Sequence, residues 1–325
     1  MKKLSLFLIV SLVMFSCSVH EPVSDLELVD HILRNNSIWS MAFESNGTAW
    51  ISTMSGYGDG LIKIDTNGTI QVFDSENSII NDEETVRDIE IDAMDKVWMS
   101  NDGLVCYEDG VFTRYDSTNS ILPQNFVKSI AIDRTDRVWA SSYAGGSDYA
   151  GVIMVDNGSF QLYSEENSAI PYERVWDIEV GPDNSIWMLS NGSFINYDGT
   201  NWVEYDEDDF GFHPAYITDI AIDNENNVCA VMDYAMSSYW EEISPALFVF
   251  NPDKTIIFNQ ARPISPSVFV DSENIVWCGG FQGVSVFDGS TYSQLDIKHA
   301  ASIIRESPSG EIWIGGGDGV YIYKK

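Results

Sequence analysis

The sequence is short of positive charge. Its 325 residues contain 17 Lys and Arg against 50 Asp and Glu, which gives a formal net charge of −33. Binding to nucleic acid or to an anionic membrane through a basic patch requires clustered Lys and Arg, so the composition excludes these partners. The acidity does not identify a ligand, because carboxylates dispersed over a surface mainly serve solubility.

Motifs of the common active sites are also missing. The four histidines show no zinc-type spacing, and the sequence has no glycine-rich phosphate loop and no nucleophile elbow. We therefore expect no catalytic residue, no cofactor and no metal. His213 and His299 are the candidates for a general base, since both fall in segments that connect the repeats described below. Exposed loop histidines are more often inert, and lyase or hydrolase activity stays an open alternative.

Long apolar runs are absent after residue 15. Lys2 and Lys3 precede the run 4–15, which is too short to span a bilayer and is followed by Ser16 and Cys17. Basic residues, a short apolar run and a small residue before the cleavage point are typical of an export signal.

Cys17 resembles the cysteine of a bacterial lipobox, which is lipid-modified and becomes the mature N-terminus. Met14 and Phe15 depart from the strictest lipobox pattern, and the alternative is plain secretion with an incidental cysteine. We predict a lipoprotein signal peptide over 1–17 with lipidated Cys17, and a tether over 18–26. The protein would then be an outer-membrane lipoprotein in the cell envelope of a Gram-negative bacterium and would contact the membrane only through this lipid. Its folded domain would face either the periplasm or the cell surface.

A repeat anchored on tryptophan runs through the rest of the chain. Its clearest copy is Val-Arg-Asp-Ile-Glu-Ile-Asp-Ala-Met-Asp-Lys-Val-Trp, residues 86–98. The intervals between anchors are 48, 41, 48, 42, 48 and 36 residues, and strand-rich repeats of 40 to 50 residues are typical of propellers. The seven anchors are Trp50, Trp98, Trp139, Trp187, Cys229, Trp277 and Trp313.

Each copy predicts two strands joined by a tight turn. An apolar residue stands nine positions before each anchor, and in six copies another follows two positions later, which is the alternation of a strand with one buried face. The position three residues before each anchor holds Gly, Asp or Asn, the residues that tolerate positive φ. These turn residues are Gly47, Asp95, Asp136, Asn184, Asn226, Asn274 and Gly310.

Two further strands complete each copy and give a seven-bladed β-propeller of four-stranded antiparallel blades. Segments such as 103–107 and 111–115 flank turn signals such as Asp109-Gly110. The last copy has three strands, and Leu28–Ile32 before Asn36-Ser37 matches the missing fourth. We therefore predict one domain over 27–325, closed by an N-terminal strand that completes the last blade, in preference to a β-solenoid or several small sandwiches.

Cys106, Cys229 and Cys278 fall on predicted strands of three blades. Export permits disulfides, but strand alternation points Cys229 and Cys278 to opposite faces of their blades. We expect three buried free thiols.

The link between the second and third strands is long in blades 1, 3 and 5, and these links lie on one face with the blade crossings. Loops held on a rigid scaffold commonly carry function. We predict ligand contacts from aromatic and acidic residues of these links, namely Tyr57, Asp59, Tyr143, Asp148, Tyr149, Tyr234, Tyr239, Trp240 and Glu241.

The ligand itself stays open at this point. Aromatic faces and carboxylates suit the stacking faces and hydroxyls of a glycan, but Tyr and Trp are equally favoured anchors for a protein partner. A third interpretation is that the loops only pack over the channel. A shared position ten residues before the anchor holds Asp88, Asp177 and Asp219. These aspartates could form a cation site in the channel or structural hydrogen bonds, and structural hydrogen bonding is the commoner role.

The repeat resembles the two-component-regulator propeller repeat. Blade 2 carries the resemblance best, with Trp98, Gly103-Leu104 and Tyr107, followed by Asn119-Ser-Ile-Leu-Pro-Gln-Asn-Phe-Val127. Propellers of that family form periplasmic sensors of hybrid histidine kinases that respond to polysaccharide fragments, which implies recognition of a glycan or a protein. This sequence shows one ring and no kinase segment, so the resemblance does not carry over the signalling output. Similar rings occur in streptogramin lyases, which would imply an enzyme that uses a histidine and a metal.

Overall fold

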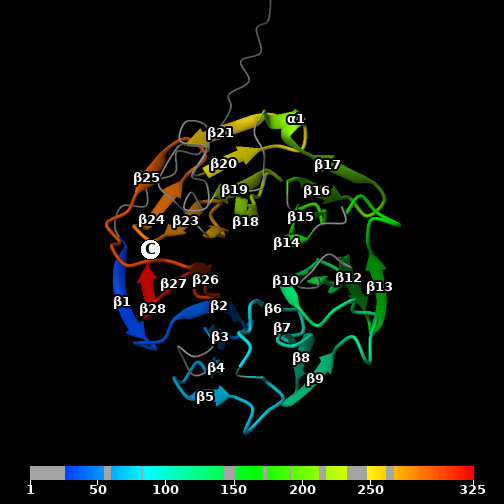
Figure 1. Ribbon diagram of the computed structural model, residues 1–325. Helices are drawn as coiled ribbons and strands as arrows, with labels where there is room; N and C mark the ends of the chain where they lie inside the picture. Colours follow the sequence, from blue (N-terminus) through cyan, green and yellow to red (C-terminus); the bar gives the residue numbers. More distant parts are fainter. Residues whose placement is uncertain are drawn as a thin grey trace, which may run out of the picture.

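The chain folds as a ring of seven radial sheets around a central opening (Figure 1). The computed structural model describes residues 26–54, 60–81, 83–142, 151–170, 174–190, 192–211, 217–232, 247–260 and 267–325. Within these ranges the strands form seven four-stranded antiparallel sheets. The predicted seven-bladed β-propeller is therefore confirmed.

The strands follow one another in chain order from the centre outward. Blade 1 has β2 (Ile38–Phe43), β3 (Ala49–Thr53), β4 (Leu61–Ile64) and β5 (Ile70–Phe73). Blade 2 has β6 (Ile89–Ile91), β7 (Val97–Ser100), β8 (Leu104–Glu108) and β9 (Val111–Tyr115). Blade 3 has β10 (Val127–Ile132), β11 (Val138–Ser142), β12 (Gly151–Asp156) and β13 (Ser159–Tyr163). Blade 4 has β14 (Val175–Val180), β15 (Ile186–Ser190), β16 (Phe194–Tyr197) and β17 (Trp202–Tyr205).

The remaining blades repeat this order. Blade 5 has β18 (Ile217–Ile222), β19 (Val228–Met232), β20 (Leu247–Phe250) and β21 (Ile256–Gln260). Blade 6 has β22 (Ser267–Val270), β23 (Val276–Gly280), β24 (Gly283–Phe287) and β25 (Tyr292–Gln294). Blade 7 has β26 (Ile303–Glu306), β27 (Ile312–Gly316) and β28 (Gly319–Lys324), with β1 (Glu27–Ile32) as its outer strand.

The ring closes as the sequence predicts. β1 pairs antiparallel with β28, with Glu27 opposite Lys324 and Ile32 opposite Val320. The first and last described strands thus share one sheet, on the left of Figure 1. This pairing covers the outer edge of β28, which would otherwise present unpaired backbone groups.

The tight turns between first and second strands are confirmed at all seven predicted positions. Each turn residue has positive φ, from 60° at Asp95 and Asp136 to 93° at Gly47. The residues nine positions before the anchors are buried in every blade, from Met41 at 0% exposure to Val268 at 4%.

Four of the seven anchors are indoles held by a carboxylate six positions earlier, namely Trp50, Trp98, Trp139 and Trp277. The indole Nε1 of Trp139 donates to Asp133 at 3.0 Å, and that of Trp277 donates to Asp271 at 2.8 Å. The same carboxylate caps the preceding turn, as where Asp133 accepts from the backbone N of Thr135 at 2.8 Å. In blades 2, 3 and 6 one aspartate therefore fixes both the turn and the indole. Blades 4 and 7 have Gly181 and Ser307 at this position, and the Nε1 atoms of their anchors find no hydrogen-bond partner among the described residues.

The cysteines behave as expected. Cys106, Cys229 and Cys278 are buried free thiols, and burial raises the pKa of Cys106 to about 11. Cys229 and Cys278 face opposite ways from adjacent blades, so both enter the core between blades 5 and 6.

A short helix was not predicted. α1 (Glu207–Phe210) is one turn long, and a capping box between Asp206 and Asp209 begins it. Gly211 ends it with φ of 75°. Among the described residues, no helix is long and apolar enough to cross a membrane.

The final lysine ties blade 7 to blade 6. Lys325 Nζ lies 2.7 Å from Asp271 Oδ2, 3.0 Å from Glu306 Oε1 and 3.1 Å from Glu273 Oε1. The Asp271 side chain is fully buried, and it also accepts the indole hydrogen bond of Trp277.

We expect Lys325→Ala to lower the free energy of unfolding by about 1–3 kcal/mol, because it removes a charged donor from a buried carboxylate. Lys324→Ala is the matched control, since Lys324 is an exposed neighbour. Urea unfolding at pH 7 measures both. Equal stability of the two variants would show that the lysine contributes nothing to ring closure.

Candidate functional site

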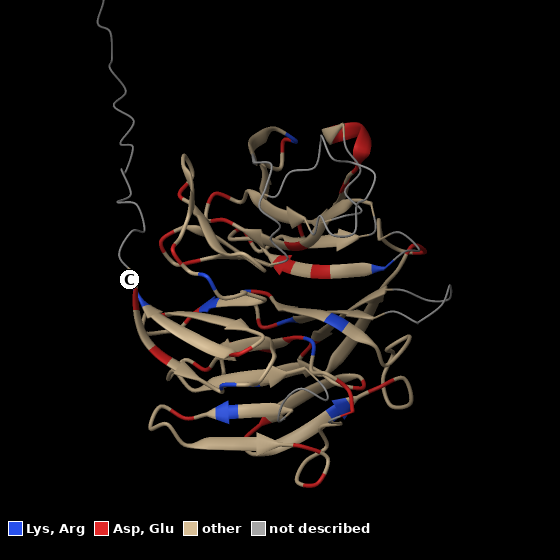
Figure 2. Cartoon of the chain, turned by 60° about the vertical axis from the view of Figure 1, so that its left-hand side comes forward, with Lys and Arg blue, Asp and Glu red and all other residues tan. Residues whose placement is uncertain are grey.

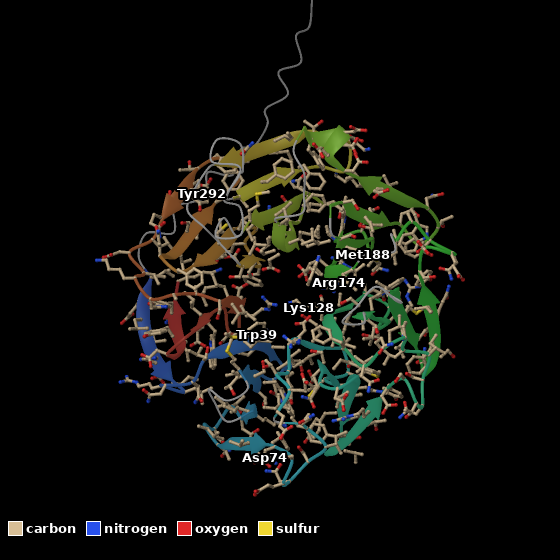
Figure 3. All side chains as sticks on the ribbon, viewed as in Figure 1. Trp39, Asp74, Lys128, Arg174, Met188 and Tyr292 are labelled. Atoms are coloured by element: carbon tan, nitrogen blue, oxygen red, sulfur yellow. The ribbon has the colours of Figure 1, made fainter. Side chains whose placement is uncertain are left out.

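A cavity of about 530 Å³ lies at the centre of the ring. Ser37 and Ala300 in its wall come from blade crossings, whereas Met54, Phe281 and Gly317 come from links between second and third strands. The cavity therefore opens on the face formed by these links. Figure 3 shows side chains around the opening, with Trp39, Lys128 and Arg174 at the inner ends of the blades and Asp74 and Tyr292 far out on the ring.

Aromatic and basic side chains occupy one half of the cavity rim. The position eleven residues before each anchor lies at or next to the start of the innermost strand, and blades 1 to 3 place Trp39, Arg87 and Lys128 there. The Arg87 guanidinium lies 6.0 Å from the Trp39 ring centre, and Lys128 Nζ lies 5.9 Å from it. Phe126 is 4.6 Å from Arg87 on the groove side of the rim. One indole thus supports two cations through cation–π contacts.

The three channel aspartates link neighbouring blades. Asp88 Oδ2 accepts from the backbone N of Ile130 at 2.7 Å, one blade onward. Asp177 accepts from Ile220 N at 2.9 Å, and Asp219 accepts from Val268 N at 2.7 Å. These amides lie on the inner edge of each blade, where no further strand can pair with them. The structural interpretation of the three aspartates therefore agrees with the geometry.

No cation site emerges from these carboxylates. Within the described ranges, no group of three or more His, Cys, Asp or Glu residues is arranged to hold a metal ion.

One residue layer deeper, Glu90 and Glu179 surround Arg305. Burial raises the pKa of Glu90 to about 8, the charge of Asp88 adds to the shift, and Arg305 opposes it. Burial also raises the pKa of Glu179 well above its usual value. Burial opposes the charge on Arg305, but the neighbouring carboxyl groups of Glu90 and Glu179 raise its pKa overall.

Two further side chains mark the cavity as a place for a ligand. Ser267 is 7% exposed and lines the cavity, and its Oγ finds no hydrogen-bond partner among the described residues. Phe281 is 72% exposed at the cavity wall. Buried hydroxyls are normally paired and large apolar side chains normally packed, so both are groups that a bound molecule can satisfy.

A second groove of about 250 Å³ adjoins the cavity between blades 2 and 3. Its wall includes Asn101, Asp102, Gln124 and Asn125. Arg87 lines both spaces. The two spaces therefore meet at this guanidinium.

The predicted ligand contacts fall outside the described residues. This holds for Tyr57, Asp59, Tyr143, Asp148, Tyr149, Tyr234, Tyr239, Trp240, Glu241 and also for Cys17 and His213. The described start of the blade 1 link, Met54, lines the cavity.

The sequence analysis missed Trp39, Arg87, Lys128 and Arg305. The sequence does contain a signal for these residues. When the copies are aligned on their anchors, Trp39, Arg87 and Lys128 all stand eleven residues before the anchor, and Arg305 stands eight residues before it. Large aromatic or basic side chains in equivalent positions of neighbouring blades are the feature that singles out Trp39, Arg87 and Lys128.

His299 does not face the cavity. Its ring stacks on Tyr321 with 3.7 Å between centroids, and its Nε2 lies 2.9 Å from the Tyr323 hydroxyl. His31 stacks on Tyr321 at 3.9 Å. Burial lowers the pKa of His299. This histidine therefore belongs to the closure of blade 7, and the described cavity wall contains no histidine.

Comparison with known proteins shows the fold. Neither a protein-family model nor a curated protein sequence matches the chain. Virginiamycin B lyase from Staphylococcus aureus has a similar structure, with a TM-score of 0.68 and 13% identity over 92% of this chain and 98% of the lyase. YCF48 bound to D1 peptide gives a TM-score of 0.66 and 12% identity over 92% of this chain and 96% of that chain.

Extracellular domains of two-component-system proteins are also among the similar structures. The extracellular domain of a hybrid two-component system from B. thetaiotaomicron gives a TM-score of 0.67 and 18% identity over 89% of this chain. This chain spans 40% of that domain's chain. At such identities the likeness shows a shared fold alone, and the chain is a seven-bladed β-propeller.

Proposed function

We propose that this propeller is a non-catalytic ligand-recognition lipoprotein of the bacterial cell envelope, anchored through Cys17, that binds a polysaccharide fragment at the face of the long links. The observation that carries the proposal is the central cavity, which opens on that face and combines aromatic, basic and carboxylate side chains. Ligand sites are concave, commonly about 300–1,000 Å³, with a few polar groups that orient the ligand.

Support for a glycan comes from the kinds of group at the rim. Trp39 and Phe281 offer aromatic surface, while Asp102, Gln124 and Asn125 offer hydrogen-bond partners for hydroxyl groups. The similarity to extracellular domains of two-component systems supports an exported location and a sensing role.

The runner-up is recognition of a protein or peptide. The similar YCF48 structure holds a D1 peptide, and Phe281 is the kind of exposed anchor that a peptide would cover. A lyase-like activity has less support, because His299 points away from the cavity.

Binding to a glycan array, followed by calorimetry with the best oligosaccharide, tests the proposal. We expect Tyr149→Ala and Trp240→Ala to weaken binding at least about tenfold, the scale of one lost aromatic contact, with the melting temperature nearly unchanged. Met94→Ala is the control, since Met94 is 63% exposed on a turn at the opposite face.

Absence of glycan binding by the unmodified protein would reject the proposal. Equal losses of stability and affinity in the two variants would show that Tyr149 and Trp240 are structural rather than ligand contacts.

A further inference from the structure

Basic side chains are concentrated at one place in a very acidic protein. Figure 2 shows Asp and Glu spread over the strands and loops, with few Lys and Arg among them. Yet Arg87, Lys128 and Arg305 all line the central cavity. With 17 basic residues against 50 acidic ones, three in one cavity wall require an explanation.

The three cations differ in how their charges are balanced. Arg305 faces Glu90 and Glu179, and Lys128 lies in the field of Asp88. Arg87 has no described side-chain hydrogen bond and no described ion pair, in contrast to Arg114 and Arg137, which each hold an aspartate within 3 Å. Arg87 is therefore the unmatched cation of the cavity.

Arg87 is nevertheless held in place. Its backbone N donates to Ser100 Oγ at 3.0 Å, and its guanidinium lies near the rings of Trp39 and Phe126. Contact with an aromatic face leaves the N–H groups in the guanidinium plane free, and these form a fork that matches a carboxylate. The side chain is thus oriented without being neutralised.

We infer that Arg87 binds a carboxylate on the ligand, and that the ligand is an acidic glycan containing uronic acid units. Arg87 stands where the central cavity meets the groove of blades 2 and 3, so a carboxylate there leaves space for sugar units on both sides. Asp102, Gln124 and Asn125 in the groove suit hydroxyl groups, and the Ser267 hydroxyl in the cavity wall has no hydrogen-bond partner among the described residues. This inference rests on the proposed function and specifies its substrate class.

The test compares an oligogalacturonide with its carboxyl-reduced form, which keeps the size and linkage but loses the charge. We expect the full protein to bind the acidic form at least about tenfold more tightly, the equivalent of one charge-assisted hydrogen-bonded pair. Binding should weaken as salt rises, since an exposed ion pair is screened. Arg87→Gln should remove the preference for the acidic form, and Arg87→Lys should retain part of it.

Arg134→Gln is the matched control, because Arg134 is exposed on the opposite-face turn between β10 and β11. It should leave affinity unchanged, and melting curves of all variants report folding. Equal binding of acidic and reduced forms, unchanged in Arg87→Gln, would overturn the inference while leaving the proposed function intact. If neither oligosaccharide nor any other glycan binds, the proposed function fails and the inference with it. Arg87-dependent binding of a peptide with a free C-terminal carboxylate, without glycan binding, would overturn the glycan class.

Discussion

Replacing Glu90 by Gln should raise the free energy of unfolding at pH 8 and leave it nearly unchanged at pH 5. The pKa of Glu90 rises from 4.5 to about 8, first through burial and then through the charge of Asp88. Between these values the folded protein keeps a proton that the unfolded chain releases, so stability falls as pH rises. The slope is at most about 1.4 kcal/mol per pH unit for one proton. Glutamine cannot ionise and removes this loss.

Other groups set the background of the pH profile. The pKa values of Asp88, Glu179 and Asp219 are also raised by burial, and they contribute in the same direction as Glu90. The pKa of His299 is lowered by burial, so its contribution is lost as pH falls through its unfolded value near 6.5 and opposes the carboxylates there. The difference between the unmodified protein and the variant therefore reports Glu90 together with its effect on the neighbouring Glu179.

Urea unfolding at intervals from pH 5 to pH 9 measures this difference. Glu204→Gln is the control, since Glu204 is exposed on the outer strand of blade 4, and its profile should parallel that of the unmodified protein. A parallel profile for Glu90→Gln as well would show that the channel solvates this carboxylate fully.

The sequence was sufficient for the fold because each blade repeats the same local chemistry. Positions of positive φ, such as Asn184 and Gly310, can be recognised from the residue type. The anchors can be recognised from their regular spacing. The short helix α1 was missed although Asp206 and Asp209 have the spacing of a capping box. Four residues are too few for hydrophobic periodicity to show.

The site was less accessible to sequence reasoning. Strand alternation tells which side of a blade a residue faces, but not which residues of different blades approach one another at the centre. Trp39, Arg87 and Lys128 are separated by 48 and 41 residues, and only the closure of the ring brings them to one rim. The long links belong to the face on which the cavity opens, and their predicted contacts stay a prediction. The described cation–π contacts of the cavity rim come from residues at the starts of the innermost strands.

Restoring tryptophan at the one anchor that lacks it should destabilise the protein. In blade 1 the Trp50 indole packs against both Phe73 and Tyr107, with 5.6 and 4.8 Å between ring centroids, and these two rings lie 5.9 Å from each other. In blade 5, Phe258 and Phe287 stack directly at 4.2 Å and pack against the cluster that contains Cys229. The indole of Cys229→Trp has to force this core apart.

The repeat supplies an acceptor for the indole of this variant. Asp223 stands six residues before Cys229, and its Oδ2 accepts from Asn227 Nδ2 at 2.7 Å. A carboxylate oxygen can accept a second donor, as Asp133 Oδ2 does from Arg137 and Trp139. The expected loss for Cys229→Trp therefore comes from overpacking and is about 1–3 kcal/mol, although the change matches the repeat.

The reciprocal change completes the test. Trp139 is fully buried against Tyr163 and Tyr197, and Trp139→Cys should cost about 3–5 kcal/mol, the range for emptying a buried tryptophan site. If neither substitution lowered the free energy of unfolding, the anchor residues of the two blades would be interchangeable. If both changes destabilise in urea unfolding, each interface between blades is packed for its own anchor, and the cysteine is matched to its neighbours rather than a defect. A gain in stability for Cys229→Trp would refute this, since it would mean that Phe258 and Phe287 separate without cost.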